Sequence, residues 1–235
     1  MKIVITDLTK FGNEDMFCTA GISLNTGKCV RPMPYLKSNI CRKLNILPGG
    51  IFSGRFSKTP DCSPPHSEDM NYTDLKFHGQ CPSKDFETIL LENAVSSIEK
   101  GFGVTLDDRQ KHIPLEMSPA ISIITLKVSP YQIKLLENSY KPGRILINFT
   151  DSDSRDFNFM PITDLGYCNF AERNASSLNE SLYKLNNFIN KQNIAFLRVG
   201  LTRPYRSQDG RNGYWIQVNG IYTFPDCFKD IRCYI

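Results

Sequence analysis

The sequence predicts a mainly β protein with some α elements, arranged as two small five-stranded barrels in tandem. Three observations favour this class. A chain of 235 residues is long enough for one large domain or two small ones. Short β-rich segments bounded by turn residues occur in both halves, and the second half adds a helix between its third and fourth strands. Residues 102–119 lack a clear period, so we expect an N-terminal domain over residues 1–119 and a C-terminal domain over residues 120–235.

The first half is expected to form a barrel with a helical extension at its end. Its Asn-Thr-Gly segment at 25–27 predicts a tight hairpin turn between two strands. The proline-rich residues 57–84 are expected to be the least structured part of the chain. A single larger β-rich domain is also compatible with this half. The strands predicted here cover residues 1–6, 15–24, 28–33 and 50–56.

Two helices are predicted from apolar residues that recur every three or four positions. The first covers residues 85–100 and is expected to end at Gly101. The second covers residues 177–191, where Ser177 and Glu180 have the spacing of a capping box. The predicted buried stripes are Phe86, Leu90, Ala94 and Ile98 in the first helix, and Leu178, Leu182, Leu185 and Ile189 in the second.

The second half shows the clearer order of elements. A loop over residues 129–142, which could contain a helical turn, separates the first two strands, and the second helix precedes the last two. Three strands, a helix and two strands make up the plan of the OB barrel, the oligonucleotide/oligosaccharide-binding fold. The loop between the fourth and fifth strands of that fold is a usual nucleic-acid contact. The strands predicted here cover residues 121–128, 144–150, 155–162, 194–202 and 214–218.

Basic residues are concentrated in two parts of the chain. The net charge of +4 is too small to argue for a polyanionic partner by itself. Residues 28–58, however, contain seven Lys and Arg and no Asp or Glu, and residues 191–212 contain five Lys and Arg against Asp209. After folding, the two stretches could meet in one groove. Alternatively, they solvate two separate loops.

The loop between the last two strands carries the sharpest functional constellation. Single-stranded nucleic acid is held by cations along its phosphates and by aromatic rings against its bases. We therefore expect the arginines to contact phosphate, and Tyr205 and Tyr214 to stack on bases. Residues 214 and 215 point to opposite faces of a strand, so at most one of them can face a ligand. The constellation is Arg203, Tyr205, Arg206, Arg211, Tyr214 and Trp215.

Arg31 is a further candidate for nucleic-acid binding. It comes just after the strand residues 28–30 and so could lie at a strand end, and Pro32 and Pro34 keep the next segment out of a sheet interior. There it could position a phosphate. Equally, it could pair with a structural carboxylate such as Asp7, because a lone arginine does not by itself define a site.

Cysteine usage and the first residues indicate a cytoplasmic protein. The chain has eight cysteines without a Cys-x-x-Cys pair, and its first seven residues resemble a strand and not a secretory signal. We therefore expect reduced thiols. No apolar run of about 18 residues occurs, so no membrane span is predicted.

Two clusters in the proline-rich segment allow chemistry but are not specific. Cys62, His66, His78 and Cys81 could close a zinc site, yet their spacing is not that of a standard finger, so no metal is predicted. His66, Glu68 and Asp69 could serve acid–base catalysis, although no nucleophile can be named beside them. Phosphate-loop, nucleophile-elbow and zincin motifs are absent from the sequence, and no cofactor is predicted.

The chain resembles the bacterial dual-OB-domain proteins, which carry two OB barrels in tandem. The C-terminal motif at 214–222 is the most specific part of the resemblance. The other matching segments are residues 18–22, 26–28, 30–32, 48–50, 65–69, 161–164 and 201–204. The resemblance implies this fold and, by analogy, recognition of nucleic acid or nucleotide. It also implies an association with bacterial mobile-element and phage-conflict genes, and it supplies no catalytic residue.

Together these patterns predict a cytoplasmic protein that binds single-stranded DNA or RNA without chemical change. Two alternatives remain open. The chain could be a protein-interaction subunit of a larger complex, using the same barrels against a partner. It could also be a nucleotide sensor or enzyme centred on His66, Glu68 and Asp69.

Overall fold

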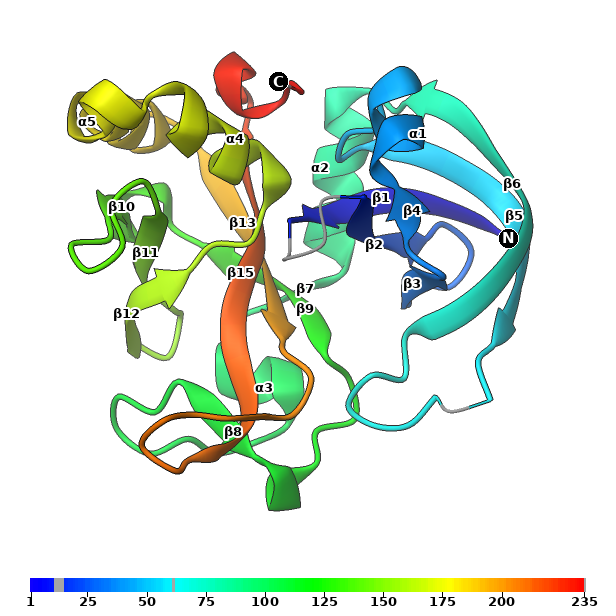
Figure 1. Ribbon diagram of the computed structural model, residues 1–235, viewed down its shortest axis with the longest axis horizontal. Helices are drawn as coiled ribbons and strands as arrows, with labels where there is room; N and C mark the ends of the chain where they lie inside the picture. The colour runs from blue at the N-terminus through cyan, green and yellow to red at the C-terminus, as the bar shows by residue number, and fades with distance from the viewer. Residues whose placement is uncertain (11–14, 61, 235) are drawn as a thin grey trace.

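The computed structural model describes residues 1–10, 15–60 and 62–234, which form two β units side by side (Figure 1). The first unit is coloured blue to cyan, and a helix, α2 (Ser83–Glu92), leads from it to the second. The elements of the first unit are β1 (Lys2–Thr9), β2 (Met16–Ser23), β3 (Cys29–Met33), β4 (Leu36–Lys37), α1 (Ser38–Lys43), β5 (Gly50–Lys58) and β6 (Asp69–Gln80).

Within the described residues, the first unit closes into a five-stranded barrel. β1 pairs with both β2 and β5, β5 with β6, β6 with β3, and β3 with β2. The β3–β6 pair is parallel and the others are antiparallel. α1 lies in the chain between the third and fourth barrel strands, which is the OB order. The apolar side chains that fill the interior include Ile3, Ile5, Phe17, Val30 and Phe52.

The second unit is larger and holds several short elements. Its two longest strands, β13 and β15, lie side by side along its centre (Figure 1). Its elements are β7 (Ala94–Val95), α3 (Ile98–Phe102), β8 (His112–Pro114), η1 (Leu115–Met117), β9 (Ile123–Val128), η2 (Pro130–Gln132), β10 (Ile133–Glu137), β11 (Ile145–Thr150), β12 (Asp156–Pro161), α4 (Leu165–Arg173), η3 (Ala175–Ser177), α5 (Leu178–Ile189), β13 (Ile194–Leu201), β14 (Tyr205–Arg206), β15 (Asn212–Phe224) and η4 (Lys229–Ile231).

The second unit is a half-open version of the same plan. β9 and β10 act as one bent strand, since β9 pairs with β13 and β10 pairs with β11. β12 continues from β11, and a parallel bridge between Ile162 and Val218 joins this sheet to β15. Asn186 of α5 covers the edge of β10: its side chain accepts from the Leu135 N–H at 2.8 Å and donates to the Leu135 carbonyl at 2.9 Å. The mainly β, dual-barrel class predicted from sequence is therefore confirmed.

The helix predicted over residues 85–100 is wrong, because the structure divides it. α2 ends before Asn93, β7 pairs with β9, and a second short helix, α3, starts after Ser97. The Ser97 hydroxyl accepts from the Lys100 N–H and so caps α3, which is how serine interrupts a helical run. Gly101 lies inside α3, where a Cβ would come within 2.5 Å of Ile124, and α3 ends instead at Gly103 with φ +67°.

Other elements differ from the sequence prediction for local reasons. β6 occupies the later part of the proline-rich segment, because its residues fall between the prolines at 65 and 82. η2 and β10 occupy the first part of the loop predicted at 129–142, and α4 was not predicted. Ser177 precedes α5 but makes no side-chain cap with any described residue, since η3 already forms the turn before it.

The segment before residue 120 contributes to the second unit. β7 pairs with β9, and β8 pairs with β15. These residues were expected to form a helical extension of the N-terminal domain. In the structure they add two short strands, β7 and β8, to the sheet of the second unit. Domain limits at 1–119 and 120–235 stay a prediction that limited proteolysis can test.

A shared apolar cluster joins the units. Val4 and Ile22 of the first barrel pack with Phe196 and Tyr222 of the second, and Phe86 of α2 lies between them. The Tyr222 hydroxyl donates to the Thr6 carbonyl at 2.6 Å. The outer face of β1 and β2 is therefore buried against β13 and β15.

Among the described residues, no helix is long and apolar enough to cross a membrane.

Candidate functional site

The loop between β13 and β15 is an exposed hairpin. β14 pairs with the start of β15, through Tyr205 with Gly213 and Arg206 with Asn212. A turn at 207–211 closes the hairpin, with Gly210 at φ +90° and the Ser207 N–H donating to the Arg211 carbonyl at 2.8 Å. Tyr205 is 57% exposed. This loop therefore presents its side chains to solvent, as a binding loop requires.

The three loop arginines differ in how they are partnered. Arg203 donates to an Asp69 carboxylate oxygen at 2.6 Å, and this ion pair partly neutralises the charge of the arginine. Arg211 pairs with its neighbour Asp209, Nε to Oδ2 at 2.9 Å, and its guanidinium lies 4.9 Å from the centre of the Trp215 ring. Arg206 is exposed and forms no ion pair with any residue that the structure describes. Arg206 is thus the loop cation most available to a phosphate.

Tyr214 is not a stacking platform, and this part of the site prediction is corrected. Its ring is 8% exposed and belongs to the core of the second unit. Trp215 points to the other face of β15, where it stacks on His112 with 5.0 Å between ring centres. The Trp215 indole N–H donates to the Tyr205 carbonyl at 3.2 Å. The outward aromatic residue of this pair is therefore Trp215.

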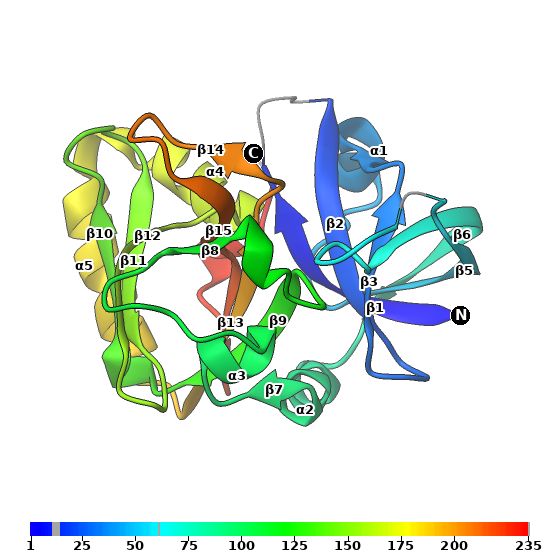
Figure 2. The same ribbon diagram turned by 90° about the horizontal axis from the view of Figure 1, so that it is seen from below.

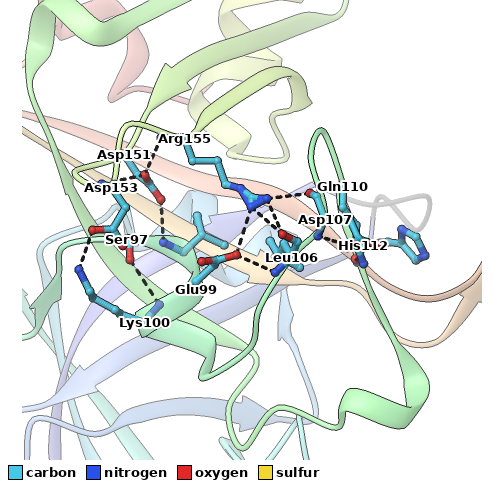
Figure 3. Close-up of polar contacts among 11 residues, drawn as sticks. Ser97, Glu99, Lys100, Leu106, Asp107, Gln110, His112, Asp151, Asp153 and Arg155 are labelled. Atoms are coloured by element: carbon cyan, nitrogen blue, oxygen red, sulfur yellow. Dashed lines mark hydrogen bonds and ion pairs between the residues drawn. The ribbon is translucent and has the colours of Figure 1, made fainter.

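The segment before β8 carries a further cation, Lys111, and a polar network holds this segment in place (Figure 3). Arg155 reaches from the turn before β12 and donates to the carbonyls of Leu106, at 2.9 Å, and Asp107, at 2.7 Å. Gln110 accepts from the Asp107 N–H at 2.7 Å and donates to the His112 carbonyl at 2.8 Å. These bonds fix the backbone on both sides of position 111.

Lys111 lies beside the aromatic ring of Phe159. Its ammonium is 5.7 Å from the ring centre of Phe159, and its carbonyl accepts from the Ile216 N–H of β15 at 3.0 Å. Burial, followed by the charge of Arg211, lowers the pKa of Lys111. The pKa of His112 is lowered by the same two causes in the same order.

Phe159 exposes its ring from β12. It is 57% exposed and has φ +56°, a conformation that bulky residues rarely adopt. The pairing of β11 with β12 shifts register here, so that Phe157 and Met160 both face the core. Strict alternation would place Phe159 on the same face as Phe157, and nothing in the sequence signals the bulge that turns it outward.

Together these side chains form one surface, which we call the aromatic–cationic face. It lies at the end of the second unit that carries β8 and β14, which Figure 2 views directly. Sequence analysis identified its loop residues but missed Lys111 and Phe159, and assigned the stacking role to Tyr214 in place of Trp215. The face comprises Lys111, Phe159, Tyr205, Arg206, Arg211 and Trp215.

Arg31 is buried and forms part of the contact between the units, which corrects its expected role as a nucleic-acid ligand. It is 5% exposed; its Nε donates to Asp69 at 2.5 Å, and its Nη2 lies 3.0 Å from His66 Nδ1. The carboxylate suggested as its partner, Asp7, pairs instead with Arg198 at 2.9 Å. Burial by itself raises the pKa of the Asp69 carboxyl, but the hydrogen bond from Arg203 and the charge of Arg31 outweigh it and lower that pKa.

Glu68 also bridges the units. One carboxylate oxygen accepts from the backbone N–H groups of Ser122, at 2.6 Å, and Ile123, at 3.0 Å, and the other accepts from the Ser122 hydroxyl at 3.0 Å. Burial, then the charges of Arg203 and Arg31, lower the pKa of His66 to about 4, so its ring is neutral near pH 7. The cluster proposed for catalysis therefore acts as an inter-unit contact in this structure.

The candidate zinc ligands are distributed over both ends of β6. His66 packs edge-on against Tyr214 before the strand begins, whereas His78 lies on β6 within 2.6 Å of the Ser53 hydroxyl and Cys81 follows its end. Across the described ranges, no group of three or more His, Cys, Asp or Glu side chains is placed to hold a metal ion.

The two basic stretches meet where Arg31 and Arg203 share Asp69, and where Arg198 donates to Cys29. α1, which carries Arg42 and Lys43, lies at the opposite end of the molecule from the loop at 203–211 (Figure 1). The single continuous groove considered from sequence is therefore not formed by α1 and this loop.

Comparison with known proteins identifies the fold of the chain. The sequence model of one protein family, described as a dual OB-containing domain, matches residues 1–221. A solved structure described as "Structure of murine DNA binding protein bound with ds DNA" aligns with 95% of this chain and 96% of its own, at 10% identity and a TM-score of 0.32. No curated protein matches the sequence.

Proposed function

Because the chain belongs to the family of dual OB-containing domains, we propose that it binds single-stranded nucleic acid through the aromatic–cationic face. The observation that carries the proposal is the exposed hairpin between the fourth and fifth strands of the second barrel, with Tyr205 and Arg206 at its surface. In OB folds this loop is a usual contact for oligonucleotides. Arg206 and Arg211 would contact phosphate, and Tyr205 would offer a flat ring, with Trp215 supporting it through the indole N–H that donates to the Tyr205 carbonyl.

The first barrel is unlike the second in what its corresponding loop contacts. The segment between β5 and β6 joins its fourth and fifth strands, and this segment docks on the second unit through Glu68 and through Ser67, whose hydroxyl donates to the Ala120 carbonyl at 2.8 Å. Cys29, on the outer side of β3, accepts from Arg198 at 3.3 Å. We therefore assign nucleic-acid binding to the second barrel, and we assign to the first barrel the role of packing against the second and stabilising it.

Single strands fit this surface better than duplexes. An exposed ring such as that of Tyr205 stacks on bases whose faces are free, and paired, stacked bases do not offer those faces. Cations beside the rings track the backbone without reading base edges. The proposal therefore covers single-stranded DNA or RNA and predicts little preference for sequence.

A salt titration of strand binding tests the proposal. Fluorescence anisotropy of a labelled 15-nucleotide oligothymidylate, and of the matching oligouridylate, is measured at about 50 and about 200 mM NaCl. Each neutralised phosphate contributes about −0.7 to the slope of log K against log salt for single strands, so affinity should fall steeply. Absence of binding to both strands at the lower salt contradicts the proposal.

Arg206→Gln isolates the charge of the loop. The variant should weaken binding similarly for both oligonucleotides and make the salt slope shallower by about one phosphate contact. Lys184→Gln is the matched control, because Lys184 is exposed on α5, away from the face, and pairs with Glu180 at 2.8 Å. Equal salt slopes for Arg206→Gln and the wild type would count against the loop as the binding element.

We further propose that binding leaves the strand chemically unchanged, which recovery of an intact oligonucleotide after incubation can check. A cytoplasmic location and a role in a bacterial phage-conflict system stay predictions. Fractionation of the native host and phage challenge of a deletion strain test them.

A further inference from the structure

We propose that Phe159 is a second nucleobase platform, so that a bound strand extends from the loop at 202–211 across to the outer side of β12. This inference rests on the function proposed above and adds a site that the loop does not contain. The ligand is one unpaired base stacked on the Phe159 ring, with its phosphate near Lys111.

The first observation is an exposed ring on a strained backbone. Phe159 has φ +56°, while its N–H donates to the Asn148 side-chain oxygen at 2.7 Å. A left-handed conformation is unfavourable for a bulky L-residue, and glycine or asparagine would adopt it at lower cost. The bulge also leaves 57% of the ring in solvent, where it gains little from burial. Strain of this kind concentrates at binding sites, and bulges re-aim side chains there.

The second observation is a cation held beside the ring. Lys111 Nζ is 5.7 Å from the Phe159 ring centre and has no carboxylate partner among the described residues. Arg211 likewise lies 4.9 Å from the centre of the Trp215 ring, so the face holds two pairs of one cation and one ring. Cations beside rings are the arrangement that follows a nucleic-acid backbone and its bases.

The third observation sets the direction of the strand. Five carboxylates and two arginines, Arg109 and Arg155, line a hollow of about 540 Å³ that also includes Asn158, beside Phe159 in the chain, so acidic groups are in excess there; the carboxylates are Glu99, Asp108, Asp151, Asp153 and Asp156. Carboxylates there repel phosphate. A strand leaving Phe159 is therefore directed over Lys111 and Arg211, toward Tyr205, and not toward the turn before β12.

The test compares base-bearing and abasic strands on matched variants. Phe159→Asn removes the ring at a position where asparagine fits the backbone, so the fold should be retained, with a melting temperature equal to or above that of the wild type. For oligothymidylate, the Kd of Phe159→Asn should rise about tenfold, equivalent to about 1.4 kcal/mol. Phe159→Trp keeps an aromatic ring at this position and should bind oligothymidylate as tightly as the wild type. Tyr183→Asn, which removes a 68% exposed ring on α5, should leave Kd unchanged.

The abasic strand shows whether the ring acts through a base. An oligonucleotide of the same length with abasic sites should bind the wild type and Phe159→Asn equally, and the salt slopes of both proteins should match. If the wild type binds with the expected salt dependence while Phe159→Asn binds as tightly, the platform is refuted and the general function stands. A loss of affinity that is equal for the abasic strand also refutes it. If the wild type binds neither strand, the proposed function itself fails.

Discussion

At the scale of single residues, side-chain direction decides which part of the chain can function. Tyr214 and Trp215 are neighbours on β15, yet one fills the core and the other lies over the surface beside Arg211. The period of a strand requires such a division but does not say which residue turns inward. Phe159 is a second example: alternation along β12 predicts that its ring faces the core, but a bulge turns the ring towards solvent.

His66 should make stability depend on pH in a defined window. Its pKa in the folded protein is about 4, below the value of about 6.5 expected for an unfolded chain. Between these values the unfolded chain binds more protons, so stability is complete above pH 6.5 and falls as the pH drops towards 4. The groups facing His66 are Arg203, Arg31 and Asp69, and the two arginine charges outweigh the carboxylate.

Urea denaturation of the wild type and His66→Asn at pH 7.5 and pH 5 measures this effect. The wild type should lose about 2 kcal/mol more than the variant over that interval. His78→Asn, at an exposed position on β6, is the control and should lose as much as the wild type. Equal losses for the wild type and His66→Asn would show that His66 is not held neutral.

At the scale of elements, the same barrel plan serves two purposes. In the second unit the hairpin between β13 and β15 is free in solvent, whereas the first unit's corresponding loop is bound to its neighbour. Glu68 carries this attachment by accepting the first backbone N–H groups that lead into β9. A buried N–H left without an acceptor is expensive, so this side chain orders the start of the strand.

Substitutions of Glu68 should show whether this side chain stabilises the protein as a hydrogen-bond acceptor or through its negative charge. Glu68→Ala leaves the Ser122 and Ile123 N–H groups unpaired and should lower the free energy of unfolding by about 2–4 kcal/mol. Glu68→Gln keeps one acceptor oxygen and should cost about 1 kcal/mol. Glu116→Ala, at an exposed site in η1, provides the baseline in chemical denaturation. Similar effects for the Ala and Gln variants of Glu68 would contradict this account.

At the scale of the whole molecule, the units are joined by a buried ion pair as well as by apolar packing. Arg198 of β13 donates to Asp7 of β1 at 2.9 Å and to the Thr125 hydroxyl at 2.6 Å, and both charged side chains are 2% exposed. Removal of one partner from a buried pair leaves an uncompensated charge. The units should therefore unfold together.

Calorimetry of the full chain tests this coupling. We expect one transition whose calorimetric and van't Hoff enthalpies agree. Arg198→Met should lower the free energy of unfolding by about 3–5 kcal/mol without splitting that transition. Asp7→Asn added to Arg198→Met should recover part of the loss, because it removes the stranded charge. Two separate transitions in the wild type, or no recovery in the double variant, would show that the pair does not couple the units.

The positions of most strands were predictable because local pattern specifies them. Alternation and β-branched residues located the strands of the first barrel, except β6, and the three-strand, helix, two-strand order of the second half indicated the OB plan. β6 was not predicted, because the prolines on both sides of it indicated a loop. The helix predicted at 85–100 does not form as one helix, because Ser97 caps a new helix and β7 pairs with β9. Local periodicity contains no information about which distant strand a segment will pair with.

The sequence alone determined the fold class, the core-facing stripe of α5 and the basic, aromatic character of the loop at 203–211, since these depend on residues that are close together in the chain. Only the tertiary structure decided which of those residues are available. It buried Arg31 against Asp69 and Tyr214 in the core, and it placed Lys111 beside Phe159 and Arg211 beside Trp215. The physical reason is that exposure and charge pairing depend on contacts between residues whose directions and neighbours are set only when the whole chain folds.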